Sequence, residues 1–129
     1  MGPHGFVAVV GESFYQETLQ GLSHLFKMIE RTERTFTATL VPEPTNAHDP
    51  NAVAVTTHDG TTIGYLAEDM AETYQTRLLR LPGLVRCPAQ LHGGDDSKDV
   101  GVVLDFKACI RVSASVARPV VRTNPARVR

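Results

Sequence analysis

Apolar and polar residues alternate with two different periods along this chain, and the change of period separates predicted strands from predicted helices. A short apolar run at residues 6–10 ends at Gly11 and predicts a first strand. The apolar side chains that follow recur every three or four residues, which is the spacing of an amphipathic helix. They are Tyr15, Leu19, Leu22, Phe26 and Ile29. Ser13 or Glu12 is the expected cap of this helix.

Strand-like alternation resumes after this helix and is interrupted by a polar loop rich in proline. Residues 31–41 alternate with a period of two and predict a half-buried strand. Three prolines fall between positions 42 and 50, and because proline fixes φ, we expect the loop 42–51 to be stiff. Residues 52–57 and 61–66 flank Asp59-Gly60, a strong signal for a β-hairpin.

The remaining half predicts one helix and three strands. Residues 67–81 form a second helical stripe that ends at Pro82-Gly83. Residues 85–91 alternate again, and Pro88 favours an edge position in the sheet. After a flexible turn at 93–99, residues 101–105 and 110–116 predict two more strands, and the end from Arg118 is expected to fray. The sum is an α+β, mainly β protein of six or seven short strands and two helices, built on a small barrel or curled sheet.

Length and composition place these elements in one soluble domain. The chain has 129 residues, 42% of them hydrophobic and 21% charged, which is enough for a single core. No apolar run approaches the ~20 residues of a membrane span, and the first residues lack the order of a signal peptide. Cys87 and Cys109 have no C-x-x-C spacing and are interpreted as small core residues. We therefore expect a cytoplasmic protein without membrane contact.

Charge is distributed unevenly along the sequence. Through Phe106 there are seven Lys and Arg against fourteen Asp and Glu, a net charge of −7. From Lys107 onward there are six positive residues and no acidic one, a net charge of +6. This indicates an acidic body with a basic C-terminal arm. Such an arm can contact phosphate, fold back onto the acidic body, or serve only solubility.

Sequence motifs exclude several enzyme classes. Neither G-x-x-x-x-G-K nor G-x-G-x-x-G occurs, which excludes an autonomous ATPase, and H-E-x-x-H and G-x-S-x-G are absent too. One dense group of potential metal ligands is interpreted as a solvated acidic turn, because hard-metal loops need more ordered oxygen donors. Its members are His92, Asp95, Asp96 and Asp99. The alternative interpretation of this turn is the active site of a metal-dependent nuclease. We expect no catalytic residue, metal or cofactor.

Two groups of residues are candidates for a binding site. Phe14 and Tyr15 are adjacent aromatics at a strand-to-helix junction. An exposed ring there would stack on an unpaired base, a contact of ~1–3 kcal/mol, whereas the alternative is that both rings pack inward. The stiff loop supplies Asn46, His48 and Asp49 as donors and acceptors. Their alternative role is turn formation, with side chains bonding their own backbone.

Three segments together resemble the HIRAN domain family: residues 9–15 (VVGESFY), residues 44–53 (PTNAHDPNAV), and Gly60 followed by residues 63–66 (IGYL). The similarity runs from about residue 7 through residue 105. HIRAN domains occur at the N-terminus of helicase-like, fork-remodelling DNA translocases and also alone in bacteria. The resemblance implies a small OB-like or SH3-like β-barrel over residues 1–106. Residues 107–129 would be a last strand and a basic arm, not a separate domain.

The resemblance also implies a pocket for the 3′ end of single-stranded DNA. Phe14 and Tyr15 would stack the terminal bases, while Asn46, His48 and Asp49 would line the pocket. The Asp49 carboxylate would accept a hydrogen bond from the terminal 3′-hydroxyl. A carboxylate suits this role, because it accepts from a hydroxyl but repels a phosphate.

Four positions differ from the DNA-binding members of the family. Tyr65 stands where they carry a histidine, and it can stack or donate a hydrogen bond. His48 replaces a tyrosine, Ser13 replaces a basic residue, and Glu68 stands where a lysine would contact phosphate. Together with the acidic body, these differences reduce the electrostatic attraction that usually dominates affinity for nucleic acid.

Two functions follow as hypotheses. The first is a non-enzymatic DNA-binding module that recognises single-stranded DNA at its 3′-hydroxyl end, in DNA repair or replication-fork processing, with a helicase or nuclease as a candidate protein partner. The alternative is a protein-interaction or regulatory module that recruits a DNA-processing enzyme and has no DNA affinity of its own. The acidic body favours the alternative, whereas the aromatic pair and the basic arm favour DNA binding.

Overall fold

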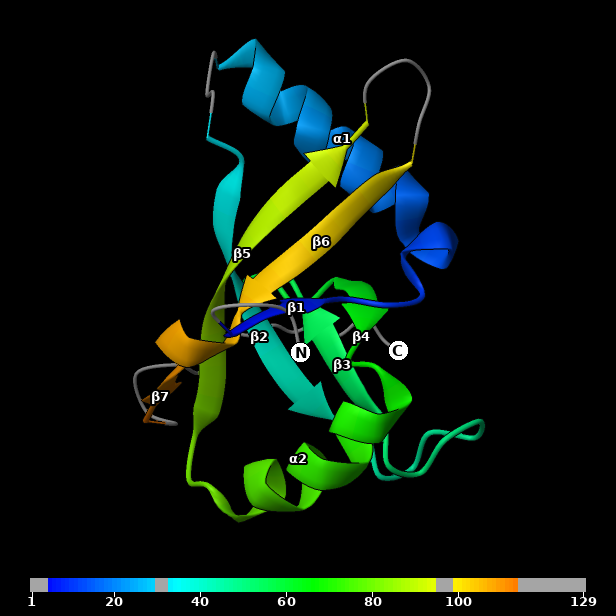
Figure 1. Cartoon of the computed structure of the whole chain (residues 1–129), viewed down its shortest axis with the longest axis vertical. Coiled ribbons are helices and arrows are strands. Elements are labelled where there is room, and N and C mark those ends of the chain that lie inside the picture. Colours follow the sequence, from blue (N-terminus) through cyan, green and yellow to red (C-terminus); the bar gives the residue numbers. More distant parts are fainter. Residues whose placement is uncertain (1–4, 30–32, 95–98, 114–129) are drawn as a thin grey trace.

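A computed structural model describes residues 5–29, 33–94 and 99–113. Within these ranges the chain forms seven strands, two α-helices and two short 3-10 helices (Figure 1). In chain order they are β1 (Phe6–Ala8), η2 (Glu12–Tyr15), α1 (Gln16–Met28), β2 (Thr35–Pro42), β3 (Val53–Thr56), β4 (Thr62–Tyr65), α2 (Glu68–Arg80), β5 (Leu84–Gly93), β6 (Val100–Asp105), η3 (Phe106–Ala108) and β7 (Ile110–Val112).

The strands form one antiparallel sheet in the order β1-β6-β5-β2-β3-β4, with β7 paired to β5. The sheet curls into a half-barrel, with α1 against one end of β5 and β6 and α2 near the opposite end of β5 (Figure 1). The predicted α+β, mainly β fold, a small OB-like barrel, is therefore confirmed.

The two ends of this strand order meet at Val10 and Tyr65. The Val10 amide donates to the Tyr65 carbonyl at 2.8 Å, and the Tyr65 amide donates back at 2.9 Å. This approach depends on Gly64, because a Cβ there would collide with the Val9 side chain and lie 2.9 Å from the Val10 carbonyl oxygen. The pair of hydrogen bonds closes the half-barrel and places η2 beside β4.

The core lies between the inward faces of the curled strands and α1. All four residues of β3 are buried, whereas β6 alternates between buried and half-buried positions, because successive side chains of a strand point to opposite faces of the sheet. Leu19 and Phe26 on α1 are buried, but Ile29, the last residue of the predicted stripe, is 54% exposed. The stripe therefore covers the core over the first three turns of the helix and not at its end.

Side-chain amides fix both helices to the sheet and its loops. Gln16 at the start of α1 accepts from the Val100 amide at 2.9 Å and donates to the Val100 carbonyl at 2.8 Å, as a neighbouring strand would. Gln75 on α2 is buried and donates to the carbonyls of Pro50 at 2.8 Å and Ala52 at 3.1 Å. The contacts of Gln75 hold the proline-rich loop in a fixed position.

The predicted start of the first helix needs correction. Residues 12–15 form a 3-10 turn, η2, before α1 begins at Gln16. Neither Ser13 nor Glu12 caps a helix, because no side-chain cap hydrogen bond is made at the start of η2 or α1. A Glu12 carboxylate oxygen accepts instead from the Val102 amide at 3.0 Å. A partner 90 residues away cannot be read from local sequence.

The expected edge position of Pro88 is wrong. Pro88 lies in β5, between β2 and β6, and faces Thr37 of β2. On its other flank, β7 pairs with residues 84–86 and β6 pairs with residues 89–93. Pro88 falls in the gap between these two ladders, where no partner requires its missing N–H.

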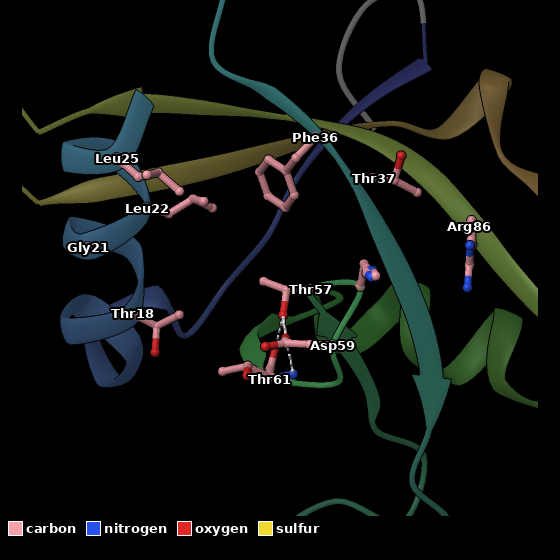
Figure 2. A pocket seen from close by; sticks show the side chains of 11 residues that line it. Thr18, Gly21, Leu22, Leu25, Phe36, Thr37, Thr57, Asp59, Thr61 and Arg86 are labelled. Carbon is pink, nitrogen blue, oxygen red and sulfur yellow. Dashed lines mark hydrogen bonds between the residues drawn. The ribbon is translucent and has the colours of Figure 1, made fainter. Parts of the chain in front are cut away.

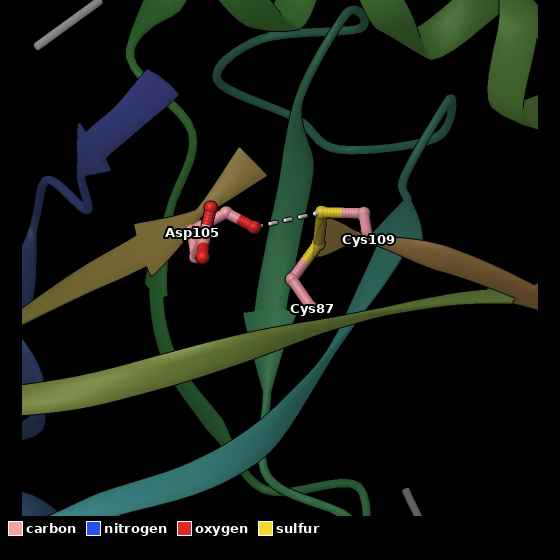
Figure 3. The surroundings of a disulfide bond; sticks show 3 residues. All are labelled: Cys87, Asp105 and Cys109. Carbon is pink, nitrogen blue, oxygen red and sulfur yellow. Dashed lines mark hydrogen bonds between the residues drawn. A yellow bond between two sulfur atoms is a disulfide. The ribbon is translucent and has the colours of Figure 1, made fainter. Parts of the chain in front are cut away.

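The two cysteines form a disulfide, which the sequence interpretation did not include. Cys87 is fully buried, as expected of a core residue, but its sulfur is bonded to that of Cys109, with the two Cα atoms 4.1 Å apart (Figure 3). The carbonyl oxygen of Asp105 lies 3.7 Å from the Cys109 sulfur. The residues are 22 positions apart, and the pairing of β7 with β5 brings them together. The cysteines therefore give no support to the expectation of a cytoplasmic protein.

Some predicted elements fall partly outside the described residues. The strand predicted over 31–41 begins at Thr35, and residues 31–32 are outside the description. The strand predicted over 110–116 is observed as Ile110–Val112, and residues 114–116 are outside it. Most of the predicted turn, at 95–98, and the arm from Arg118 are also outside. Among the described helices, none is long and apolar enough to cross a membrane.

The closing contact predicts unequal effects of two Gly→Ala substitutions. Gly64→Ala should lower the free energy of unfolding by about 1–3 kcal/mol, because the new methyl group forces Val9 and Val10 away from β4. Gly21→Ala is the control: Gly21 is in α1 with open space around its Cβ position, so alanine should stabilise the protein by up to ~1 kcal/mol. Urea unfolding monitored by circular dichroism measures both. Equal effects of the two substitutions would contradict the closing role of Gly64.

The disulfide predicts a redox-dependent stability. Closing a 22-residue loop should stabilise the fold by about 3 kcal/mol relative to the reduced chain. The melting temperature of the oxidised protein should therefore fall when a thiol reductant is added. Cys109→Ser should melt at the lower temperature with or without reductant. An unchanged melting temperature of the parent protein on full reduction would show that the bond contributes nothing.

Candidate functional site

All six residues proposed from sequence line one pocket of about 360 Å³, between η2, the proline-rich loop and the start of α2. They are Phe14, Tyr15, Asn46, His48, Asp49 and Tyr65. The apolar residues Val10, Ala52 and Leu66 also line it, together with Gly11 and Glu68. Residues from three separate segments are thus brought together where the half-barrel closes.

The aromatic wall of the pocket is formed at the turn between β1 and α1. Gly11 has a positive φ of 77°, which glycine adopts readily, and its carbonyl accepts from the Phe14 amide at 3.1 Å. This turn leaves the Phe14 ring 85% exposed. Tyr15 is half-buried, with its ring centroid 6.4 Å from that of Tyr65. The alternative in which both rings pack inward is therefore wrong for Phe14.

Asn46 shapes the loop with its side chain. Its carbonyl oxygen accepts from the amides of His48 at 2.8 Å and Asp49 at 3.0 Å, and its NH₂ group donates to Glu43 at 3.0 Å. This arrangement is an Asx turn extended by one further bond. Although Asn46 lines the pocket as predicted, its polar atoms are engaged by the loop, and it positions its neighbours.

Asp49 combines turn formation with exposure to the pocket. One carboxylate oxygen accepts from the Asn51 amide at 2.9 Å, and the Asp49 carbonyl accepts from the Ala52 amide at 3.0 Å. The alternative of turn chemistry is thus correct for one oxygen of the carboxylate. The carboxylate has a second oxygen, and the half-buried residue lines the pocket. His48, one position earlier, is exposed at the rim.

Glu43 joins the loop to β4, and sequence reasoning did not identify it. The same Glu43 oxygen accepts from the Tyr65 hydroxyl at 3.0 Å and from Asn46. Burial raises the pKa of Tyr65 well above its usual value, and the hydrogen bond to Glu43 and the adjacent Tyr15 raise it further. Tyr65 is therefore held as a neutral donor. A glutamate between two prolines carries no local signal of this role.

The rim of the pocket is acidic. Glu68, exposed at the start of α2, is one of its lining residues. A second cavity of about 270 Å³ shares Asp49 and Glu68 and adds Asn51, Asp69 and Glu72. Within the described part of the chain, neither cavity is lined by lysine or arginine. Acidic residues in the first turn also stabilise α2 through its dipole, so their presence alone does not identify a ligand.

A larger, more open groove of about 760 Å³ lies between α1, the start of β2 and the β3–β4 turn (Figure 2). Leu22 and Phe36 form an apolar side, and Arg86 lies at the far end. Asp59 accepts from the hydroxyl of Thr57 and the amide of Thr61, and these bonds, that of Thr57 foremost, hold the pKa of its carboxyl below the usual value. None of the residues proposed from sequence lines this groove.

The predicted absence of a metal site concerns residues that are only partly described. Over residues 5–29, 33–94 and 99–113, no group of three or more His, Cys, Asp or Glu could hold a metal ion. His92 and Asp99 belong to this part of the chain, whereas Asp95 and Asp96 lie outside it. The interpretation of this group as a solvated turn stays a prediction.

The neutral Tyr65 predicts a loss of stability at alkaline pH. Its raised pKa means that the unfolded chain ionises first, near pH 10, so stability is lost as the pH rises above that value. Tyr65→Phe should show a smaller decrease in melting temperature between pH 9 and pH 11 than the parent protein. Equal decreases in the two proteins would contradict the burial of a neutral hydroxyl at Glu43.

Comparison with known families assigns this arrangement to one of them. The HIRAN domain family model matches residues 4–86, from β1 to the first residues of β5. This segment contains all six pocket residues named above. Neither curated proteins nor solved structures gave a match. HIRAN domains are binding domains, which indicates nucleic-acid binding in a general sense. With the model matching well over half of its length, the chain belongs to the HIRAN domain family.

Proposed function

We propose that this protein is a non-enzymatic module that binds the 3′-hydroxyl end of single-stranded DNA in the pocket at the closure of the half-barrel, in DNA repair or fork processing. The observation that carries the proposal is the convergence of an exposed aromatic ring and a carboxylate on one pocket, from segments more than 30 residues apart. The three steps are base stacking, recognition of the terminal hydroxyl and attraction of the backbone.

Stacking is the first step. Phe14 offers an exposed flat face, and the rings of Tyr15 and Tyr65 lie beside each other in the same pocket. Every base has a π face, so such a platform binds unpaired bases of any sequence, with ~1–3 kcal/mol for each base. A duplex does not present these faces. The platform therefore favours single strands and tolerates different sequences.

Recognition of the end is the second step. The loop holds Asp49 through its own turn and through Asn46, and α2 holds the loop through Gln75. A fixed carboxylate accepts a hydrogen bond from a terminal hydroxyl without further ordering. A phosphate at the same position would meet the negative charges of Asp49 and Glu68. The pocket should therefore reject a 3′-phosphate and an internal nucleotide.

Attraction of the DNA backbone is the third step. Within these residues the pocket lining carries no lysine or arginine. The C-terminal part of the sequence, from Lys107 onward, contains six positive residues, and these would supply the contacts to phosphate. Binding should consequently be weak at high salt.

The acidic rim favours a second candidate function. A protein-interaction module that recruits a DNA-processing enzyme, a helicase or a nuclease, needs no affinity for phosphate. The carboxylates of Asp49 and Glu68 would then face a basic segment of that partner. Absence of oligonucleotide binding at low salt would select this function over the first.

Oligonucleotides that differ only at the 3′ terminus test end recognition. A labelled single strand ending in a 3′-hydroxyl should bind at least tenfold more tightly than the same strand ending in a 3′-phosphate, because the phosphate places like charges together. Fluorescence anisotropy at low salt measures both dissociation constants. Equal affinities would remove the claim of end recognition, and absence of binding would remove DNA binding altogether.

Matched variants assign the discrimination to the pocket. Asp49→Asn should weaken binding of the 3′-hydroxyl strand and reduce the ratio between the two strands to about threefold or less, because the amide no longer repels phosphate. Asp59→Asn removes the same charge at the β3–β4 turn, outside the pocket, and should leave the ratio unchanged. A ratio unaffected by Asp49→Asn would place end recognition elsewhere.

A further inference from the structure

The chemistry of the pocket is complementary to a cation as well as to a base. Its wall has the exposed ring of Phe14 and the half-buried ring of Tyr15, and its rim has Asp49 and Glu68. Aromatic faces attract cations through their quadrupole, and a neighbouring carboxylate adds a direct charge pair. Rings and carboxylates on one pocket, with no lysine or arginine in its described lining, suit a guanidinium group.

The chain carries such groups in a segment outside the described residues. Residues 114–129 contain four arginines, no lysine and no acidic residue: Arg118, Arg122, Arg127 and Arg129. Arginine is better suited than lysine to a site of this kind, because its planar group stacks on rings and pairs with carboxylates through two hydrogen bonds. The arm and the acidic pocket are therefore opposite in charge, and the arginine side chain suits rings and carboxylates together.

The arm is long enough to reach the pocket of its own molecule. The last described residue is Ser113, next to β7, and sixteen residues follow Ser113 in the sequence. Extended, they span about 53–58 Å, which matches the path of about 57 Å halfway round the surface of a compact domain of this length. An arginine near the end of the arm can therefore arrive at the aromatic wall without any change in the fold.

We infer that an arginine of residues 118–129 occupies the pocket of the same chain when no nucleic acid is bound, with its guanidinium on the Phe14–Tyr15 wall and against the Asp49 and Glu68 carboxylates. A DNA end must displace this arginine before it can stack. The arginine then becomes available for phosphates outside the pocket. The competition between this arginine and a DNA end rests on the proposed function, whereas the contact between arm and pocket does not.

The tyrosines provide a direct readout in the full-length protein. The chain has three tyrosines and no tryptophan. Tyr15 and Tyr65 line the pocket, whereas Tyr74 on α2 packs against Phe106 of η3, with ring centroids 5.2 Å apart. Incorporation of 3-fluorotyrosine gives three ¹⁹F signals, which single Tyr→Phe variants assign. Tyrosine signals report the contact between arm and pocket directly. DNA affinity does not, because the same arginines also attract phosphate and their loss would weaken DNA binding in either case.

The comparison is between the parent protein and a quadruple variant with Arg118→Gln, Arg122→Gln, Arg127→Gln and Arg129→Gln. The signals of Tyr15 and Tyr65 should differ between the two proteins, whereas that of Tyr74 should not. A synthetic peptide of residues 114–129, added to the quadruple variant, should move the two pocket signals back toward their parent positions. The parent signals should not change on tenfold dilution, because the contact is intramolecular. A shift on dilution would overturn the intramolecular contact in favour of one between two copies.

Substitutions in the pocket of the quadruple variant give the specificity of this contact. Phe14→Ala should weaken peptide binding by about fivefold, the loss expected for one cation–π contact. Glu68→Lys should weaken the peptide by at least fivefold yet strengthen an oligonucleotide, since the charge change acts with opposite signs on the two ligands. Glu17→Lys makes the same change on α1, outside the pocket lining, and should leave peptide affinity unchanged. An unmoved Tyr74 signal shows that each variant is folded.

The outcomes separate this inference from the proposed function. If the peptide leaves the Tyr15 and Tyr65 signals unchanged while a 3′-hydroxyl oligonucleotide moves them, the arm contact is wrong and the DNA function stands. If the peptide moves them and the oligonucleotide does not, the arm contact stands and the DNA function fails. Peptide binding that is indifferent to both Phe14→Ala and Glu68→Lys would also overturn the inference.

Discussion

The pair of hydrogen bonds between Val10 and Tyr65 is the contact on which the pocket depends. It joins the chain after β1 to β4, the two ends of the strand order. Phe14 and Tyr15 follow Val10 in the sequence, and Leu66 and Glu68 follow Tyr65, so closing the half-barrel brings both groups to one place. Gly64 makes this approach possible, since a larger residue would meet Val9 and Val10. Fold and site therefore share one constraint.

A second set of contacts holds the polar side of the pocket rigid. Glu43 accepts from Tyr65 and from Asn46, and Asn46 in turn accepts from two amides of the loop. Gln75 fixes the loop from the opposite side through the Pro50 carbonyl. A loop held at both ends keeps Asp49 in position before a ligand arrives, which reduces the ordering cost of binding.

Period and turn chemistry predicted the elements well, because both are local. The alternation of residues 35–40, the Asp59-Gly60 hairpin and the two helical stripes each depend on neighbours within a few positions. Features that depend on distant partners were missed. Glu12 accepts from Val102 and not from its own helix, Pro88 lies in a gap between two ladders, and Cys87 is bonded to Cys109. These partners are distant in the sequence and cannot be predicted from the neighbouring residues.

The candidate site shows the same division. Similarity to a family pointed to six residues, and the structure brings all six to one pocket. The similarity did not distinguish the roles of these residues. The side-chain oxygen of Asn46 accepts hydrogen bonds from the loop, and one carboxylate oxygen of Asp49 accepts from the backbone. Glu43 and Gln75 were absent from the prediction, because a glutamate and a glutamine acquire these roles only through partners up to 25 residues away.

Mapping of backbone amide shifts during titration with a short 3′-hydroxyl single strand tests the central claim most directly. The account predicts that the largest changes cluster at Gly11, Phe14, Asp49 and Tyr65 and leave the Thr57–Thr61 turn of the larger groove undisturbed. Changes confined to that groove, or spread evenly over the surface, would contradict the claim that the closure of the half-barrel builds the receptor.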